Sequence, residues 1–217
     1  IAIEKENIEM IKLLLSCKNI DINKILVNFV YGNENWKFEN TVLTYAIEKE
    51  NIEIIKLLLS NPNIDANQFC HDILEFDDDD NYDDYNYDFY EKERKPFNAF
   101  TLSLRKGNIE IIKLLLSSPS IGLNQNYSPL FLAIEIEDIE IIKLLLLNSS
   151  IDVNKKYDNK TPLFFAIEKD NFEIIKLILS NPNIDVNEGD GNKTPLLLAI
   201  EKDNFEIIKL ILSNPNI

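Results

Sequence analysis

The chain has 217 residues, 45% of them hydrophobic, and a formal net charge of −15 from 37 acids and 22 bases. This excess of acids argues against nonspecific binding of nucleic acid or of anionic membranes. The sequence contains no apolar run of about 18 residues and no basic-then-apolar N-terminal segment, so we expect neither membrane insertion nor a signal peptide. Cys17 and Cys70 form no paired spacing, which predicts reduced thiols in a cytoplasmic or nuclear protein.

One helical pattern recurs along the chain, first as IEMIKLLLS directly after Asn7. Each copy follows an Asn or Asp that can cap a helix: Asn7, Asn51, Asn108, Asp138, Asn171 and Asn204. The last two spacings are both 33 residues, and a fixed period in this range is typical of stacked repeats. We therefore predict a single array of six repeats over residues 1–217, with insertions between the first three.

The first insertion, Lys24–Asn40, predicts a lengthened β-hairpin finger. Apolar residues alternate with other residues on both sides of a Gly-Asn break: Val27, Phe29 and Tyr31 before it, then Trp36 and Phe38 after it. Two interpretations stay open. The apolar residues cover the neighbouring helices, or they form an aromatic contact patch for a partner that includes Trp36.

The second insertion, Gln68–Phe97, is strongly acidic. It holds eleven acids against three bases, a net charge of −8 that exceeds half of the protein's total. Like charges repel one another, so we predict a disordered loop, with a docking segment for a basic partner as the alternative. A calcium loop is not expected, because Tyr82 stands where such a loop needs glycine and Asp88 where it needs glutamate.

The third repeat lacks the usual start of its first helix. Asn98-Ala99-Phe100 stands where the last two repeats have Thr-Pro-Leu. We therefore expect a weaker helix cap here, at a cost of about 1 kcal/mol.

The last two repeats, Asn159–Asn187 and Asn192–Ile217, have almost the same sequence. Thr161 can cap a first helix, and Pro162 suits the first helical position because its missing N–H has no partner there in any case. Asn171 can cap a second helix, which Pro182 and Asn183 end.

This unit resembles the ankyrin repeat. The residues that match the ankyrin motif are Thr161, Pro162, Leu163, Ala166, Glu173, Lys176, Leu177, Leu179, Asp185, Val186 and Asn187. It departs from the motif at Phe164, which replaces a histidine, and at Asp170-Asn171, which replaces Gly-His. The resemblance extends over nearly the whole chain. It implies an all-α solenoid of stacked helix–turn–helix units with finger loops, two of them enlarged by the insertions.

Nothing in the sequence predicts catalysis. His71 is the only histidine and adjoins Cys70, but neighbouring side chains point apart and no third group is present to orient the pair. The sequence offers no second histidine for a zinc site and no glycine-rich phosphate loop. We predict a protein that is not an enzyme and has no cofactor and no metal site.

The resemblance implies that a protein partner binds the fingers and the exposed face of each first helix, which together line a concave groove. The predicted contacts are Ile136, Tyr157, Asp158, Lys160, Glu168, Lys169, Asp190, Lys193, Glu201 and Lys202, with Trp36 added from the first insertion. Ile136 and Tyr157 rank first, because Glu and Lys also occur on a helix simply as good helix formers that keep it soluble.

Two functions fit these observations. The first is a protein–protein interaction scaffold, and the alternative is a structural spacer within a longer repeat array. Ile1–Asn7 corresponds to the middle of a unit, and the chain stops before the expected Asp-Val-Asn. We therefore expect a segment of a longer protein, and uncapped ends that favour end-to-end self-association.

Overall fold

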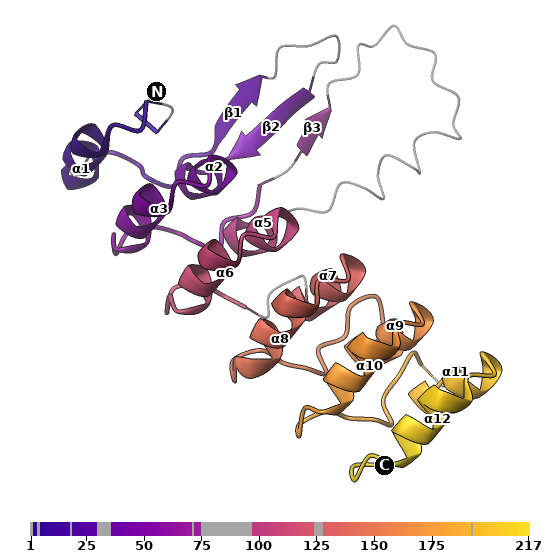
Figure 1. The fold of residues 1–217 in the computed structure, drawn as a ribbon. Helices are drawn as coiled ribbons and strands as arrows, with labels where there is room; N and C mark the ends of the chain where they lie inside the picture. The colour runs from indigo at the N-terminus through magenta and orange to yellow at the C-terminus, as the bar shows by residue number, and fades with distance from the viewer. Residues whose placement is uncertain are drawn as a thin grey trace, which may run out of the picture. The chain divides into compact units, whose positions relative to one another are not determined.

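The computed structural model describes residues 2–3, 5–17, 19–29, 36–70, 72–74, 97–123, 128–191 and 193–217 (Figure 1). For residues 26–29, 36–39 and 72–74 it describes the backbone alone. The chain divides into two compact units. Unit 1 is Ile1–Ser103 with Glu110–Ile121, and unit 2 is Leu104–Ile109 with Gly122–Ile217.

Unit 2 is a stack of helix pairs. The pairs are α7 (Pro129–Glu135) with α8 (Ile139–Leu147), α9 (Pro162–Glu168) with α10 (Phe172–Leu179), and α11 (Pro195–Glu201) with α12 (Phe205–Leu212). The first helices of successive pairs pack side by side, and so do the second helices (Figure 1). This is the stacking that the repeat period predicts.

Local sequence explains where these helices begin and turn. Thr161 and Thr194 each accept a backbone N–H three residues ahead, and a proline follows each of them. Asp138, Asn171 and Asn204 cap the second helices in the same way. Each residue before these second caps has a left-handed backbone, with φ +57° at Glu137, +58° at Asp170 and +54° at Asp203. The ankyrin motif has glycine there, the residue that adopts this conformation without strain.

Unit 1 holds α1 (Ile8–Ser16), α2 (Val42–Glu48) and α3 (Ile52–Leu59). Asn7 and Asn51 cap α1 and α3, again by accepting the N–H three residues ahead. Both α1 and α2 pack on α3. A third helix pair, α5 (Ala99–Lys106) and α6 (Ile109–Leu116), contains the boundary between the units.

A small antiparallel sheet in unit 1 lies in the two insertions. Its order is β1 (Leu26–Phe29), β2 (Trp36–Asn40) and β3 (Asp72–Leu74). The hairpin of β1 and β2 falls in the first insertion, where alternation predicts strands. The third strand was not predicted, because its backbone bonds come from β2, a segment distant in sequence.

The two ends of the acidic insertion have regular backbone pairing, so the prediction of a disordered loop over Gln68–Phe97 is wrong at Cys70, Asp72–Leu74 and Phe97. Cys70 and Phe97 exchange two backbone hydrogen bonds of 2.7 and 3.0 Å, and β3 follows Cys70 closely. Residue 71 and residues 75–96 lie outside the described residues, so disorder or partner docking there stays a prediction.

The expected weak cap of the third repeat is wrong. The Asn98 side chain accepts the Thr101 N–H at 3.0 Å, and the Thr101 hydroxyl accepts the Asn98 N–H at 2.9 Å. Thr41 and Thr44 make the same reciprocal pair at the start of α2. The amide oxygen of asparagine accepts the backbone N–H that the threonine hydroxyl accepts in other repeats, so a full capping box forms without the Thr-Pro start.

Candidate functional site

Two fingers of unit 2, before α9 and before α11, are tight hairpins. Tyr157 and Lys160 exchange backbone hydrogen bonds of 3.0 and 3.1 Å, and the intervening Asp158 and Asn159 have φ of +51° and +62°. Left-handed φ at both central residues is the pattern of a type I′ turn. The next finger has an equivalent pair of backbone hydrogen bonds 33 residues later, of 3.0 and 2.9 Å between Asp190 and Lys193. The predicted contact residues Asp158 and Asp190 therefore lie in hairpin turns.

The finger that contains Glu188 and Gly189 is fixed against α9. The Thr161 hydroxyl, which caps α9, also donates a hydrogen bond of 2.9 Å to the Glu188 carbonyl of the next finger. Gly189 is buried there, and a Cβ at this position would overlap the Lys193 carbonyl oxygen and lie 2.9 Å from the Phe164 ring. No residue but glycine fits this contact without a shift of the backbone.

Two lysine–glutamate ion pairs form on this surface, one within each of the last two repeats. The Lys160 ammonium donates to both carboxylate oxygens of Glu168 at 2.9 Å, and Lys193 makes the equivalent ion pair with Glu201. The hydrogen bond to Glu168 raises the pKa of Lys160 above its ordinary value, against an opposing effect of burial. These four residues, predicted to contact a partner, form ion pairs within the protein, and their contact with a partner stays a prediction.

Aromatic rings pack beside the fingers. The Phe131 ring stacks on Phe165 with centroids 4.7 Å apart and an interplanar angle of 15°. It also lies 5.6 Å from Tyr157, tilted by 58°. Tyr157 is therefore half-buried by an intramolecular contact, while Ile136, at the end of α7, is 41% exposed. Phe131 and Phe165 are not among the site residues predicted from the sequence. Both lie in first helices, Phe131 two residues before the recurrent alanine and Phe165 directly before it.

Two lysines end the first helices of the last two repeats. The Lys169 ammonium lies 5.7 Å from the centroid of the Phe165 ring. Lys202 caps α11 and donates a hydrogen bond of 3.1 Å to the Glu168 carbonyl at the end of α9. The structure thus brings Ile136, Lys169 and Lys202 to the same position of three successive first helices. We call this surface, with the fingers beside it, the finger–helix surface.

Trp36 belongs to a different unit from the other predicted contact residues. It lies in β2 of unit 1, paired with Leu74, and its side chain falls outside the described atoms. All the other predicted contact residues belong to unit 2. A role of Trp36 in binding stays a prediction.

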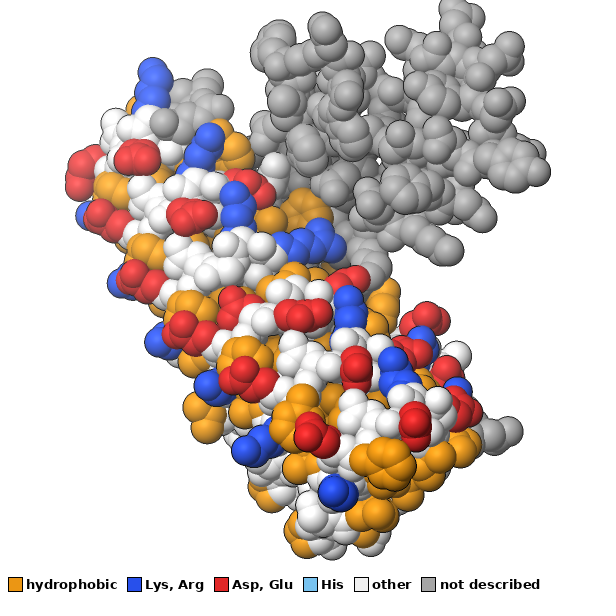
Figure 2. All heavy atoms as spheres, turned by 45° about the vertical axis from the view of Figure 1, so that its right-hand side comes forward, with side chains coloured by type: hydrophobic (Ala, Val, Ile, Leu, Met, Phe, Trp, Pro, Cys, Tyr) orange, Lys and Arg blue, Asp and Glu red, His pale blue; other side chains and the backbone are white. Residues whose placement is uncertain are grey.

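Acidic and basic side chains are interspersed on the face drawn in Figure 2, with hydrophobic atoms between them. Hydrophobic side chains are also exposed on the last helix pair: Leu197, Ile200, Phe205 and Leu212. End-to-end association through them stays a prediction.

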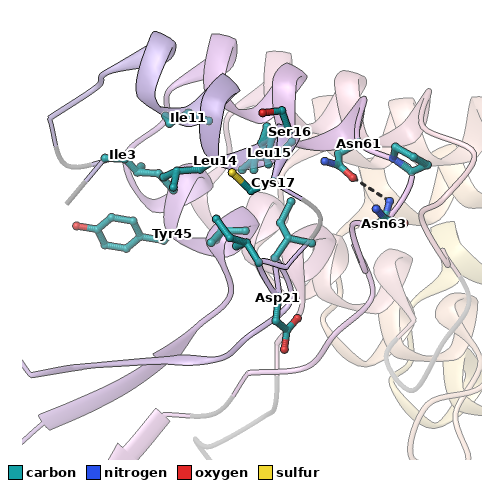
Figure 3. Close-up of a pocket in the computed structure, with 16 residues that line it drawn as sticks. Ile3, Ile11, Leu14, Leu15, Ser16, Cys17, Asp21, Tyr45, Asn61 and Asn63 are labelled. Atoms are coloured by element: carbon teal, nitrogen blue, oxygen red, sulfur yellow. Dashed lines mark hydrogen bonds between the residues drawn. The ribbon is translucent and has the colours of Figure 1, made fainter.

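Unit 1 contains a cavity of about 490 Å³ between α1 and the α2–α3 pair (Figure 3). Aliphatic side chains such as Ile3 and Leu14 line it, together with the Tyr45 ring and the Cys17 thiol. None of the predicted contact residues borders this cavity. Within the described part of the chain, no three metal-ligating side chains come together, and no helix is long and apolar enough to cross a membrane.

Comparison with known proteins identifies solved structures and a protein family that share this architecture. The chain is similar in structure to EF0377, an ankyrin repeat protein, with a TM-score of 0.62, 20% identity and coverage of 98% of this chain and 94% of that one. It is also similar to an ankyrin repeat domain (ABAYE2397) from Acinetobacter baumannii AYE, with a TM-score of 0.63, 22% identity and coverage of 97% and 94%. No curated protein matches in sequence. A family model described as "Ankyrin repeats (3 copies)" matches residues 1–70, 83–157 and 136–217. The fold is therefore the predicted ankyrin-repeat solenoid, and the chain belongs to the ankyrin repeat family.

Proposed function

We propose that this protein is a non-enzymatic interaction scaffold that binds a protein partner through the finger–helix surface of unit 2. Ankyrin repeats are generally protein–protein interaction modules. The observation that carries the proposal is Ile136, an exposed apolar residue at a position where the next two repeats have lysine. Glu and Lys favour both helix formation and solubility at exposed helix positions, so isoleucine here departs from the residue type that recurs at this position.

Two half-buried aromatic rings of unit 2 support this proposal. Tyr157 and Phe165 flank the buried Phe131 ring, and aromatic side chains supply much of the energy of protein interfaces. The hairpin fingers and the ion pairs hold the surface in one conformation before a partner arrives, which lowers the entropy lost on binding.

Two matched substitutions test the proposal once a partner has been isolated. Ile136→Glu should weaken binding about tenfold or more, because it places a charge in an apolar contact. Leu147→Glu is the control, since Leu147 is 84% exposed on the second helix of the same repeat and lies outside the proposed surface. Equal dissociation constants for the wild type and Ile136→Glu would contradict the proposal.

The alternative, a structural spacer, is favoured by asparagine side chains that link successive repeats. Asn154 donates to the Asn183 carbonyl at 2.8 Å and accepts the Asp185 N–H at 2.9 Å. Asn214 donates to the Leu179 carbonyl at 2.9 Å. Such links stiffen an array whether or not it binds anything. A spacer predicts that no discrete partner binds and that Ile136→Glu behaves like its control.

A further inference from the structure

The glutamates at the ends of α9 and α11, Glu168 and Glu201, already form ion pairs with lysines of the same repeat. Both oxygens of Glu168 accept from Lys160 at 2.9 Å, and Glu201 pairs with Lys193. A partner cation would have to displace a lysine held by the same repeat. The finger–helix surface therefore offers little to basic side chains at these positions, despite the acidity of the whole chain.

The next residue along each helix has the opposite character. Lys169 and Lys202 are exposed, and neither has a carboxylate at ion-pair distance among the residues that the structure describes. Lys169 contacts the Phe165 ring, and Lys202 contacts a backbone carbonyl. Both contacts orient the ammonium group without neutralising its charge. A partner carboxylate could bind either lysine without displacing another ion.

An apolar site continues this row. Ile136 occupies the corresponding C-cap position directly after α7, and α9 packs against both α7 and α11. The three repeats thus present one apolar side chain followed by two cations, and the half-buried ring of Phe165 lies beside Lys169. Complementarity of charge and polarity defines what fits against such a row.

We propose that the partner presents a short acidic segment to this row, with an apolar side chain against Ile136 and carboxylates against Lys169 and Lys202. This inference rests on the proposed function and specifies the chemistry of its partner.

The net charge of −15 opposes an acidic ligand only at long range. At physiological ionic strength the Debye length is about 8 Å, so distant repulsion is largely screened while contact pairs are not.

The test is selection of short random peptides on the full chain, followed by charge reversal. Selected peptides should combine acidic residues with an apolar or aromatic one. The Lys169→Glu/Lys202→Glu variant should bind them about tenfold more weakly or worse, since each reversal replaces an attraction by a repulsion. The control is Lys176→Glu/Lys209→Glu, which reverses the same number of charges on exposed second-helix positions 33 residues apart.

Selected peptides that are basic or uncharged would overturn the inference, and so would equal weakening by both variants. Failure to select any peptide would also count against an acidic segment. The scaffold function itself would then still be decided by Ile136→Glu and its control on an isolated partner, so the two failures are distinguishable.

Discussion

The helices α1 and α10 have closely similar sequences, IEMIKLLLS and FEIIKLIL, yet they differ in burial. In α10, Ile174 and Ile178 are 0% exposed, whereas the corresponding Met10 and Leu14 in α1 are 41% and 42% exposed. An asparagine caps both helices through the same bond. The helix α10 packs between α8 and α12, while α1 packs on α3 and borders the cavity.

This comparison shows that neighbours, rather than the repeat sequence, decide how much each helix contributes to stability. In repeat arrays the stability is approximately the sum of the intrinsic stabilities of the units and the interfaces between nearest neighbours. A helix of about nine residues is marginal in water without such packing. We therefore expect α1 to be the weaker helix although its sequence is equally suited to the fold.

The largest expected change in the free energy of unfolding comes from truncating a buried side chain. Ile178→Ala should lower the free energy of unfolding by about 2–5 kcal/mol, because the side chain is fully buried. Leu14→Ala at the matching position should lower it by about 1 kcal/mol or less. Urea denaturation followed by far-UV circular dichroism measures both. Similar losses in the two variants would show that α1 is as well packed as α10.

A second comparison concerns two hydroxyl groups at equivalent N-cap positions, Thr161 before α9 and Ser128 before α7. Thr161→Val should cost about 1–3 kcal/mol, because it removes both the cap and the bond to the Glu188 carbonyl. Ser128 occupies the same place before α7, but its buried hydroxyl has no hydrogen-bond partner in the described part of the chain. Ser128→Ala should therefore be neutral or slightly stabilising. A loss at Ser128 as large as that at Thr161 would contradict this assignment.

The turns between helices allow a smaller but opposite change. Asp203→Gly should stabilise the protein by about 0.5–1 kcal/mol, because φ is +54° there and glycine adopts this conformation without strain. The gain from Asp170→Gly should be smaller, because the Asp170 carboxylate accepts a hydrogen bond of 3.0 Å from Asn204. Melting temperatures of the two variants test the order, and a larger gain at Asp170 would reverse it.

The smallest expected effect is the pH dependence of the Lys160–Glu168 pair. Folding raises the pKa of Lys160, so its contribution is complete below the ordinary lysine value of 10.5 and disappears as the pH rises through the higher folded value. Lys160→Met should cost up to about 1 kcal/mol at neutral pH, and the difference from wild type should vanish in strong alkali. Lys155→Met, at an exposed finger position, is the control. A difference that persists unchanged in strong alkali would exclude the ion pair as its source.

The sequence predicted the elements that depend on near neighbours in the chain. Capping by Thr161 and Asn171 follows from residues a few positions apart, and the structure confirms both. The sequence did not predict β3, whose partner strand lies far away in sequence. It also did not predict the stacking of Phe131 on Phe165, which belong to two different repeats.

The predicted contact residues show the same limit. A lysine and a glutamate eight residues apart look the same in sequence whether they bind each other or face solvent. Only the hairpin geometry, which folds Lys160 back over α9, reveals that they form a pair. Ile136 could be singled out because it differs from the residue that recurs at its position.

The ion pair between Lys160 and Glu168 has a consequence for how a repeat protein can gain further repeats by duplication. Both partners lie within one 33-residue period, as do Lys193 and Glu201. Duplicating a gene segment of that length would copy both partners, so an added unit would bring no unbalanced charge at these positions. Binding specificity could then diverge at the positions of Ile136, Lys169 and Lys202 without loss of the pairs that hold each finger in place.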